Sequence, residues 1–220
     1  MSEAEHWLEP EEQQCRLLLA VSAAPLGPEA QTALENALAR TEVAGLLLDA
    51  PDAPDEELAR RLRCCHEAAA ALLLVDRLEP VASGLADGVH LRDWQEVAGA
   101  RRRLGEERLV GAACGGSRHA AMVAGENGAD YVMFGAPETD LEAGADRLVE
   151  LCTWWSELFV LPCAAAIPPD PGLARRLARA GAGFVVIAPD FRESPAEALE
   201  TIATLAAAIT AADGEGNGMS

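Results

Sequence analysis

Short runs of hydrophobic residues recur along the chain, and longer stretches with helical spacing separate them. We interpret the runs as strands, and they cover residues 16–22, 43–49, 72–75, 88–91, 109–114, 129–135, 158–167 and 183–188. Their hydrophobic residues are continuous and do not alternate with polar ones, which is typical of strands buried on both faces of a parallel sheet. The pattern therefore predicts eight buried parallel strands.

Helical patterns or short crossovers follow these runs. The predicted helices cover residues 29–40, a segment that holds Leu58 and Leu62, residues 94–104, a segment after Ser117, residues 143–155, a segment up to Ala180, and residues 196–212. A brief crossover at 79–85 separates the third and fourth runs. Asp55, Asp93 and Ser117 stand where a side chain would cap the following helix.

This alternation predicts a single-domain α/β fold, a TIM or (β/α)8 barrel, over residues 15–212. We expect residues 1–14 to form a flexible acidic leader and residues 213–220 a disordered tail. An open doubly wound sheet is the alternative. It is disfavoured because no G-x-G-x-x-G sequence follows the first strand.

Composition narrows the functional classes. Half of the 220 residues are hydrophobic, which predicts a folded chain, and the net charge of −19 argues against nucleic-acid or anionic-membrane surfaces. No hydrophobic run reaches the ~20 residues of a membrane-spanning helix. The first residues are acidic, unlike those of a signal peptide. We therefore expect a cytoplasmic protein whose partner is a small molecule.

Cysteine spacing does not indicate a metal site. The chain has six cysteines, namely Cys15, Cys64, Cys65, Cys114, Cys152 and Cys163. None forms a C-x-x-C pair or has zinc-finger spacing, so we expect free and mostly buried thiols. Cys114 has no neighbouring cation to lower its pKa, which favours inert packing over a nucleophilic role.

Charged residues stand where several predicted strands end. Asp49 ends the second strand, Asp76-Arg77 follows the third, and Arg92-Asp93 follows the fourth. In a barrel these strand ends gather at one mouth, which is where such folds carry their chemistry. The mouth is therefore the predicted functional site.

The residues around these strand ends resemble the thiamine phosphate synthase and TenI family. Four segments carry the resemblance, namely VDRLEPVASGLADGVHL (75–91), VGAACGGSRHAAMVAGENGADYVMFGAPET (110–139), LPCAAAI (161–167) and AGAGFVVIAPDF (180–191). In that family a barrel mouth binds an aminopyrimidine pyrophosphate through magnesium and basic residues. The nitrogen of a thiazole phosphate then displaces pyrophosphate. The resemblance implies the same barrel, a role in thiamine metabolism, a phosphorylated ligand and Mg²⁺ as cofactor.

The resemblance also implies roles for individual residues. Asp76 matches the metal-binding Asp of the family's N-D-R sequence, and Asp93 stands near its second metal carboxylate. The implied substrate or phosphate contacts are Arg77, Gly135, Thr139, Ala165 and Ala166.

The chain departs from the family at its anion-binding positions. The second strand ends in LLLDAPDA where the family has Q-x-R-x-K, so no cation follows it. The loop GAPETD lacks the family's Lys, and Ala165-Ala166 replaces a Gly-Gly pair, whose close backbone approach a Cβ would narrow. His119 stands a few residues after the position of the family's TenI-type His. The anion-binding half of the site is therefore incomplete.

Structural interpretations stand beside these functional ones. Asp76-Arg77 is equally typical of an ion pair at the mouth, His90 of a packed and hydrogen-bonded histidine, and Asp93 of a helix N-cap. Two functions stay open: a Mg²⁺-assisted transferase with a degenerate site, or a non-catalytic or repurposed barrel that binds a small phosphorylated molecule. Adjacent Trp154 and Trp155 cannot both face inward on a helix, which leaves a homo-oligomer open.

Overall fold

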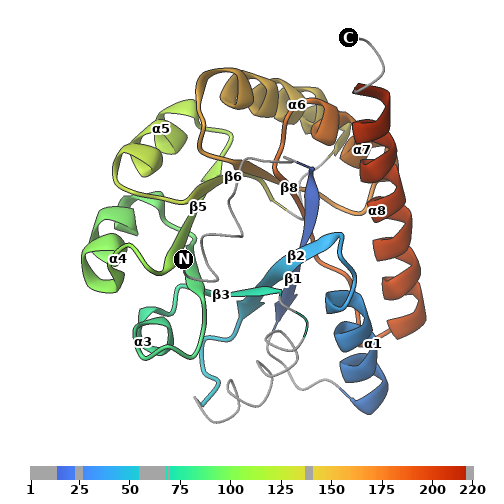
Figure 1. The fold of residues 1–220 in the computed structure, drawn as a ribbon, viewed down its shortest axis with the longest axis horizontal. Coiled ribbons are helices and arrows are strands. Elements are labelled where there is room, and N and C mark those ends of the chain that lie inside the picture. The colour runs from blue at the N-terminus through green and yellow to red at the C-terminus, as the bar shows by residue number, and fades with distance from the viewer. Residues whose placement is uncertain (1–13, 23–26, 55–67, 69, 137–140, 217–220) are drawn as a thin grey trace.

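The computed structural model describes residues 14–22, 27–54, 68, 70–136 and 141–216. Eight parallel strands close into a barrel in chain order (Figure 1). They are β1 (Arg16–Ser22), β2 (Val43–Asp49), β3 (Ala71–Val75), β4 (Gly88–Leu91), β5 (Leu109–Gly115), β6 (Tyr131–Gly135), β7 (Cys163–Ala166) and β8 (Phe184–Ile187). The predicted (β/α)8 barrel is confirmed.

Helices surround the barrel on its outside (Figure 1). They are α1 (Pro28–Leu38), α3 (Leu78–Ala82), the 3-10 helix η3 (Trp94–Glu96), α4 (Val97–Leu104), α5 (Arg118–Glu126), α6 (Leu141–Leu158), α7 (Pro171–Arg179) and α8 (Pro195–Gly216). Ser117 caps α5 as predicted, because its side chain accepts a hydrogen bond from the Ala120 N–H. None of the helices described is long and apolar enough to cross a membrane.

The strands contribute side chains to two separate hydrophobic cores, one on each face of the sheet. Leu17 and Leu19 point outward and pack beneath the helices, whereas Leu18 lies between them and points into the barrel. Both cores combine large and small side chains, such as Trp155 and Ala37 in the outer one and Tyr131 and Ala164 in the inner one. Burial on both faces explains why the strands appear in the sequence as continuous hydrophobic runs.

Two aspartates stabilise the end of the barrel where the strands begin. Asp87 precedes β4 and accepts a hydrogen bond from Leu72 N of β3 (2.8 Å). Asp130 precedes β6 and accepts one from Val110 N of β5 (2.7 Å), and it also pairs with Arg101 of α4 (2.5 Å). Both carboxylates therefore provide acceptors for backbone N–H groups near the starts of the strands.

Most predicted strand limits agree with the structure within one or two residues, but the predicted start of the seventh strand is wrong. The pattern placed this strand at 158–167, whereas it spans Cys163–Ala166 because α6 continues through Leu158. Phe159 stacks on Trp155 (ring centroids 4.0 Å apart), and its N–H donates to the Trp155 carbonyl. Leu158 is 64% exposed, which a buried strand would not allow.

Other differences lie at helix ends. The single helix predicted at 94–104 is divided into η3 and α4, and α8 runs to Gly216, beyond its expected end at Ala212. The predicted helix that holds Leu58 and Leu62, with its cap Asp55, lies outside the described residues. So do residues 1–13 of the expected leader and residues 217–220 of the expected tail.

Candidate functional site

Three charged side chains meet where β2, β3 and β4 end. Asp49 is the last residue of β2, Asp76 follows β3, and Arg92 follows β4. Arg92 Nη2 donates to Asp49 Oδ2 (2.6 Å), and Arg92 Nη1 donates to Asp76 Oδ2 (2.7 Å). We call these three residues the mouth triad. They lie at the carboxyl ends of the strands, the end at which TIM barrels carry their active sites.

The backbone fixes Asp76 in an unusual conformation. Its φ of 53° makes it the one non-glycine residue with positive φ in the described part of the chain. Its N–H donates to the His90 carbonyl (3.0 Å), and its Oδ1 accepts from the Arg92 N–H (2.9 Å). Aspartate tolerates this left-handed region better than most residues, and these two bonds hold it there. The ends of β3 and β4 are therefore joined before any ligand arrives.

The triad is partly open to solvent. The side chains of Arg92, Asp49 and Asp76 are 58%, 41% and 36% exposed. The pKa of Arg92 is raised, first by its hydrogen bond to Asp76, so it is a cation at any physiological pH. Exposed ion pairs of this kind contribute at most about 1 kcal/mol to stability. These charges are thus within reach of a ligand and add little to the fold.

The sequence predicts Arg92 among the charges at the mouth but assigns it no role in binding or catalysis. The second strand has no cation of its own, and the structure brings one to Asp49 from the end of β4. The spacing between His90 and Arg92 indicates where Arg92 lies, because residues two apart on a strand point to the same face of the sheet. His90 points into the barrel, so Arg92 continues its inner face at the mouth.

A buried histidine–tyrosine pair lies on that same inner face. His90, Gly111 and Tyr131 are in register on the neighbouring strands β4, β5 and β6. His90 Nδ1 lies 2.8 Å from the Tyr131 hydroxyl oxygen, and the two rings stack with centroids 5.7 Å apart. A Cβ at Gly111 would lie 2.1 Å from the Tyr131 ring, so glycine makes the contact sterically possible. The prediction of a packed, hydrogen-bonded His90 is confirmed.

The other nitrogen of this histidine has no partner among the residues that the structure describes. His90 is 3% exposed, and its Nε2 makes no hydrogen bond to any of the residues described. Burial lowers its pKa to about 4; Asp76 raises the pKa by a smaller amount, and Arg92 lowers it further. The ring is therefore neutral near pH 7, and an unpaired polar nitrogen is costly unless something bonds to it.

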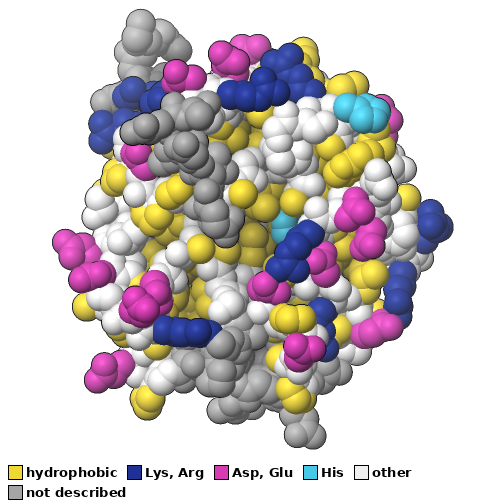
Figure 2. Space-filling view, turned by 180° about the vertical axis from the view of Figure 1, so that it is seen from behind, with side chains coloured by type: hydrophobic (Ala, Val, Ile, Leu, Met, Phe, Trp, Pro, Cys, Tyr) yellow, Lys and Arg dark blue, Asp and Glu magenta, His cyan; other side chains and the backbone are white. Residues whose placement is uncertain are grey.

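Hydrophobic side chains surround this polar pair. The inner core includes Val75, Met133, Ala166 and Val186, with Ala113 packed against it. Figure 2 shows a face of the molecule on which hydrophobic side chains reach the surface near the centre, with basic and acidic side chains beside them. An organic ring would be favoured over such a surface, while the charged part of the same ligand would be favoured at its border.

Arg77 and Asp93 make structural contacts within the protein. Arg77 Nη1 donates to the carbonyl oxygens of Ala50 (3.0 Å) and Ala53 (2.7 Å), which ties the segment after β2 to the end of β3. Asp93 Oδ1 accepts from Gln95 N (2.9 Å) and caps η3, as its structural interpretation predicted. Neither contact tests the predicted roles in phosphate or metal binding, which stay predictions.

The predicted phosphate-binding backbone lies on β6 and β7. Gly135 has φ of 75° and pairs with Ala166, whose carbonyl oxygen would lie 2.6 Å from a Cβ at Gly135. Of the two alanines, Ala166 belongs to the inner core and Ala165 to the outer one. Only Ala166 therefore turns its side chain toward the barrel interior. Thr139 lies outside the described residues.

Two further predicted candidates lie away from the triad's contacts. Burial raises the pKa of the Cys114 thiol to about 12, which agrees with the inert packing expected for it. His119 on α5 meets the Trp94 ring edge-on, with centroids 6.0 Å apart.

A divalent cation does not fit the triad as it stands. Both Asp76 oxygens accept hydrogen bonds from Arg92, and Asp93 is engaged in capping η3. Among the residues that the structure describes, no three His, Cys, Asp or Glu side chains are grouped so as to hold a metal ion. A metal ion at Asp76 would have to displace the guanidinium.

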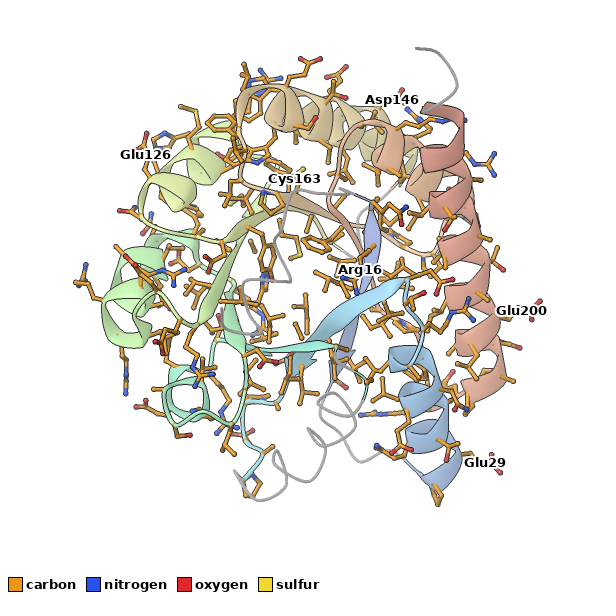
Figure 3. The ribbon with its side chains drawn as sticks, in the orientation of Figure 1. Arg16, Glu29, Glu126, Asp146, Cys163 and Glu200 are labelled. Atoms are coloured by element: carbon orange, nitrogen blue, oxygen red, sulfur yellow. The ribbon has the colours of Figure 1, made fainter. Side chains whose placement is uncertain are left out.

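A small cavity lies at the opposite end of the barrel. It has a volume of about 110 Å³, and its lining includes Arg16, Thr41, Glu42 and Ile209. Arg16, labelled in Figure 3, donates from Nη2 to the Val43 carbonyl (3.2 Å), and burial lowers its pKa. No residue predicted for the site lines this cavity, so the mouth stays the candidate site.

Comparisons with known proteins place the chain in a family. Residues 19–190 match the family model described as "Thiamine monophosphate synthase". A curated "Thiamine-phosphate synthase" of Rhodospirillum centenum is 36% identical over 190 residues, which cover 83% of this chain and 91% of the relative. Another with that name, from Erythrobacter litoralis, is 44% identical over 107 residues, covering 46% of this chain and 50% of the relative.

Solved structures share the fold. A thiamine phosphate pyrophosphorylase from Pyrococcus furiosus superposes with a TM-score of 0.70 at 19% identity, covering 91% of this chain and 98% of that one. A tryptophan synthase alpha subunit from Legionella pneumophila superposes with a TM-score of 0.74 at 14% identity, covering 96% and 99%. At such identities the likeness concerns the barrel alone.

Proposed function

The chain belongs to the thiamine monophosphate synthase family, and on that basis we propose that its barrel mouth joins an aminopyrimidine pyrophosphate to a thiazole phosphate. The thiazole nitrogen supplies the electron pair for a new bond to the methylene carbon of the pyrimidine. The carbon–oxygen bond to pyrophosphate breaks, and its electron pair leaves with the pyrophosphate. The reaction needs no oxidant or reductant, and its products are thiamine phosphate and inorganic pyrophosphate.

The observation that carries the proposal is a cation at the border of a hydrophobic mouth. Negative charge develops on the departing pyrophosphate, and a preorganised guanidinium stabilises it. Arg92 is held by Asp49 and Asp76 and is 58% exposed, so part of its N–H fork faces solvent. The hydrophobic inner surface beside it suits the pyrimidine and thiazole rings.

Backbone and buried polar groups supply the remaining contacts in this proposal. His90 Nε2 is neutral and unpaired within the described residues, so it is suited to one hydrogen bond with a heteroaromatic ring. The thiazole phosphate is assigned to backbone N–H groups near Gly135, Ala165 and Ala166, and the resemblance adds Thr139 as a further contact. Arg77 would support this site by holding the segment after β2 in place.

Magnesium is the cofactor that the resemblance implies, at Asp76 and Asp93. The described contacts of these carboxylates do not favour it, because both Asp76 oxygens accept hydrogen bonds from Arg92 and Asp93 Oδ1 accepts one from Gln95 N. The transfer proposed here therefore relies on the chain's own cation.

Product formation tests the proposal. The purified full chain, given both substrates, should produce thiamine phosphate and pyrophosphate in equal amounts, as measured by liquid chromatography with mass detection. Arg92→Ala should lower the rate by about 100-fold or more, the usual cost of losing a group that stabilises transition-state charge. Arg103→Ala is the matched control, because Arg103 also pairs with one carboxylate, Glu79, but on the outer surface. A folded wild-type chain that makes no product would overturn the proposal.

A second function is favoured by one specific feature. The two carboxylates of the mouth triad outnumber its one guanidinium, which disfavours binding of a polyanion. A repurposed barrel that binds a small, weakly charged or singly phosphorylated molecule would fit this balance. Calorimetric titration with phosphate and with pyrophosphate separates the two functions: the repurposed barrel should bind pyrophosphate no more tightly than phosphate, whereas the transferase should prefer pyrophosphate.

A further inference from the structure

The mouth triad places a cation between two carboxylates that belong to different strands. Asp49 ends β2 and Asp76 follows β3, and the Arg92 side chain contacts both at 2.6 and 2.7 Å. A cation that bridges two carboxylates and faces a phosphorylated ligand is what a divalent metal provides in many phosphate-handling sites. In this chain the position between the carboxylates is taken by a side chain.

We infer that the Arg92 guanidinium takes the place of the divalent cation at this mouth, so the chain binds its anionic ligand there without a metal. The inference deepens the proposed function and rests on it for the identity of the anion. The geometry of the triad carries the substitution itself.

Two features of these contacts hold the Arg92 guanidinium in place as part of the folded protein. Its backbone N–H bonds to Asp76 Oδ1 while its Nη1 bonds to Asp76 Oδ2, so both carboxylate oxygens already have a partner. Asp76 in turn keeps a left-handed backbone, and its N–H bonds to the His90 carbonyl. Such a conformation persists only where the surroundings fix it, which means that the arrangement belongs to the fold.

The guanidinium also keeps donors for a ligand. It has five N–H groups in a planar fork, and its contacts with the two carboxylates engage Nη1 and Nη2. A fork of this shape matches two oxygens of a phosphate group, which a metal ion would otherwise bind. Since the side chain is 58% exposed, an anion reaches it without displacing either aspartate.

A second observation marks the same place as a binding site. His90 lies two residues before Arg92 on the inner face of the barrel, and its buried Nε2 has no hydrogen-bond partner in the described part of the chain. A buried nitrogen of this kind points to a ligand or water that completes it. The cation and this nitrogen thus belong to residues two apart in the chain, with His90 in β4 and Arg92 just after its end.

Metal binding in the absence of substrate tests the inference. The probe is Mn²⁺, and its free concentration is measured by electron paramagnetic resonance during titration of the full chain. We expect wild type to bind Mn²⁺ weakly. The control variant Arg103→Ala, which removes an equal charge from the outer surface, should bind it equally weakly. Arg92→Gly should bind at least about tenfold more tightly, because the two carboxylates then face each other without a counter-charge. The double variant with Asp76→Asn should lose that gain.

Arg92→Gln provides a second variant that keeps a side chain at the position, and circular dichroism checks the fold of each protein. A wild-type Mn²⁺ site that Asp76→Asn abolishes would overturn the inference. Arg92→Gly and Arg92→Gln binding no more tightly than Arg103→Ala would also overturn it. Failure of the chain to make thiamine phosphate would instead count against the proposed function, since this titration contains no substrate.

Discussion

His90, Gly111 and Tyr131, on three neighbouring strands, form a polar contact inside the hydrophobic barrel. His90 and Tyr131 meet across β5 because Gly111 between them has no side chain. A histidine in the middle of a hydrophobic run was interpretable from sequence as a packed side chain. Its partner Tyr131 could not be predicted, because the pairing depends on the register of three strands, and the sequence pattern does not contain this register.

Replacing Gly111 by alanine tests this arrangement. The new Cβ would lie 2.1 Å from Tyr131 Cζ, so the ring has to move and its bond to His90 Nδ1 is broken. We expect Gly111→Ala to lower the free energy of unfolding by about 3 kcal/mol, the upper range for overpacking a core. Urea unfolding measures it, with Gly99→Ala as control.

Gly99 is an exposed position of α4, and the nearest atom to a Cβ there is Arg102 Nη2 at 3.9 Å. The same substitution should therefore stabilise the protein by up to about 1 kcal/mol through helix propensity. Equal effects of the two substitutions would contradict the steric role of Gly111.

The buried His90 also predicts a pH dependence of stability. Burial lowers its pKa from 6.5 to about 4. At pH values between these two, His90 is therefore protonated in the unfolded chain and neutral in the folded chain. Stability should fall as pH drops from 6.5 to about 4, by roughly 3 kcal/mol from this residue at the usual 1.4 kcal/mol per unit. Urea unfolding of wild type and His90→Gln isolates the effect, because the variant lacks this proton. A difference between the two that stays constant over that range would contradict it.

At the scale of elements, the hydrophobic pattern was sufficient to predict the barrel. Continuous runs separated by helical spacing define β/α units, and connecting such units in parallel closes the sheet. The pattern wrongly assigned residues 158–162 to the seventh strand. Hydrophobic residues that follow a helix have the same pattern whether they begin a strand or extend the helix. Here Trp155 and Phe159 stack along the helix axis, and that contact extends the helix end.

Asp130 provides a test of how the elements are joined. It accepts from Val110 N at 2.7 Å and pairs with Arg101, whose side chain is only 16% exposed. Asp130→Ala would leave both groups without this acceptor, and we expect a loss of about 3 kcal/mol. Asp146→Ala is the matched control, because Asp146 is 87% exposed in its ion pair with Arg176 and should cost no more than about 0.5 kcal/mol. Thermal unfolding compares them, and similar losses for both variants would contradict the structural role of Asp130.

At the scale of the whole molecule, the charges explain why the sequence left the function open. The chain carries a net charge of −19, and its second strand ends without a cation, which suggested a site that had lost its anion-binding half. Parallel pairing of β2, β3 and β4 brings Arg92 from the end of β4 to Asp49 at the end of β2. That contact joins residues 43 positions apart. The strand ends in the sequence indicate that both residues lie at the mouth, but the ion pair itself depends on the geometry of three neighbouring strands.

Product formation in two buffers tests the role of Arg92 in the reaction itself. The full chain is given both substrates, once with Mg²⁺ and once with excess EDTA, and thiamine phosphate is measured over time. If Arg92 serves as the cation of the site, product should form at comparable rates in both buffers. Product that forms only with Mg²⁺ would contradict the role of Arg92, and a folded chain that forms none in either buffer would contradict the proposed transfer.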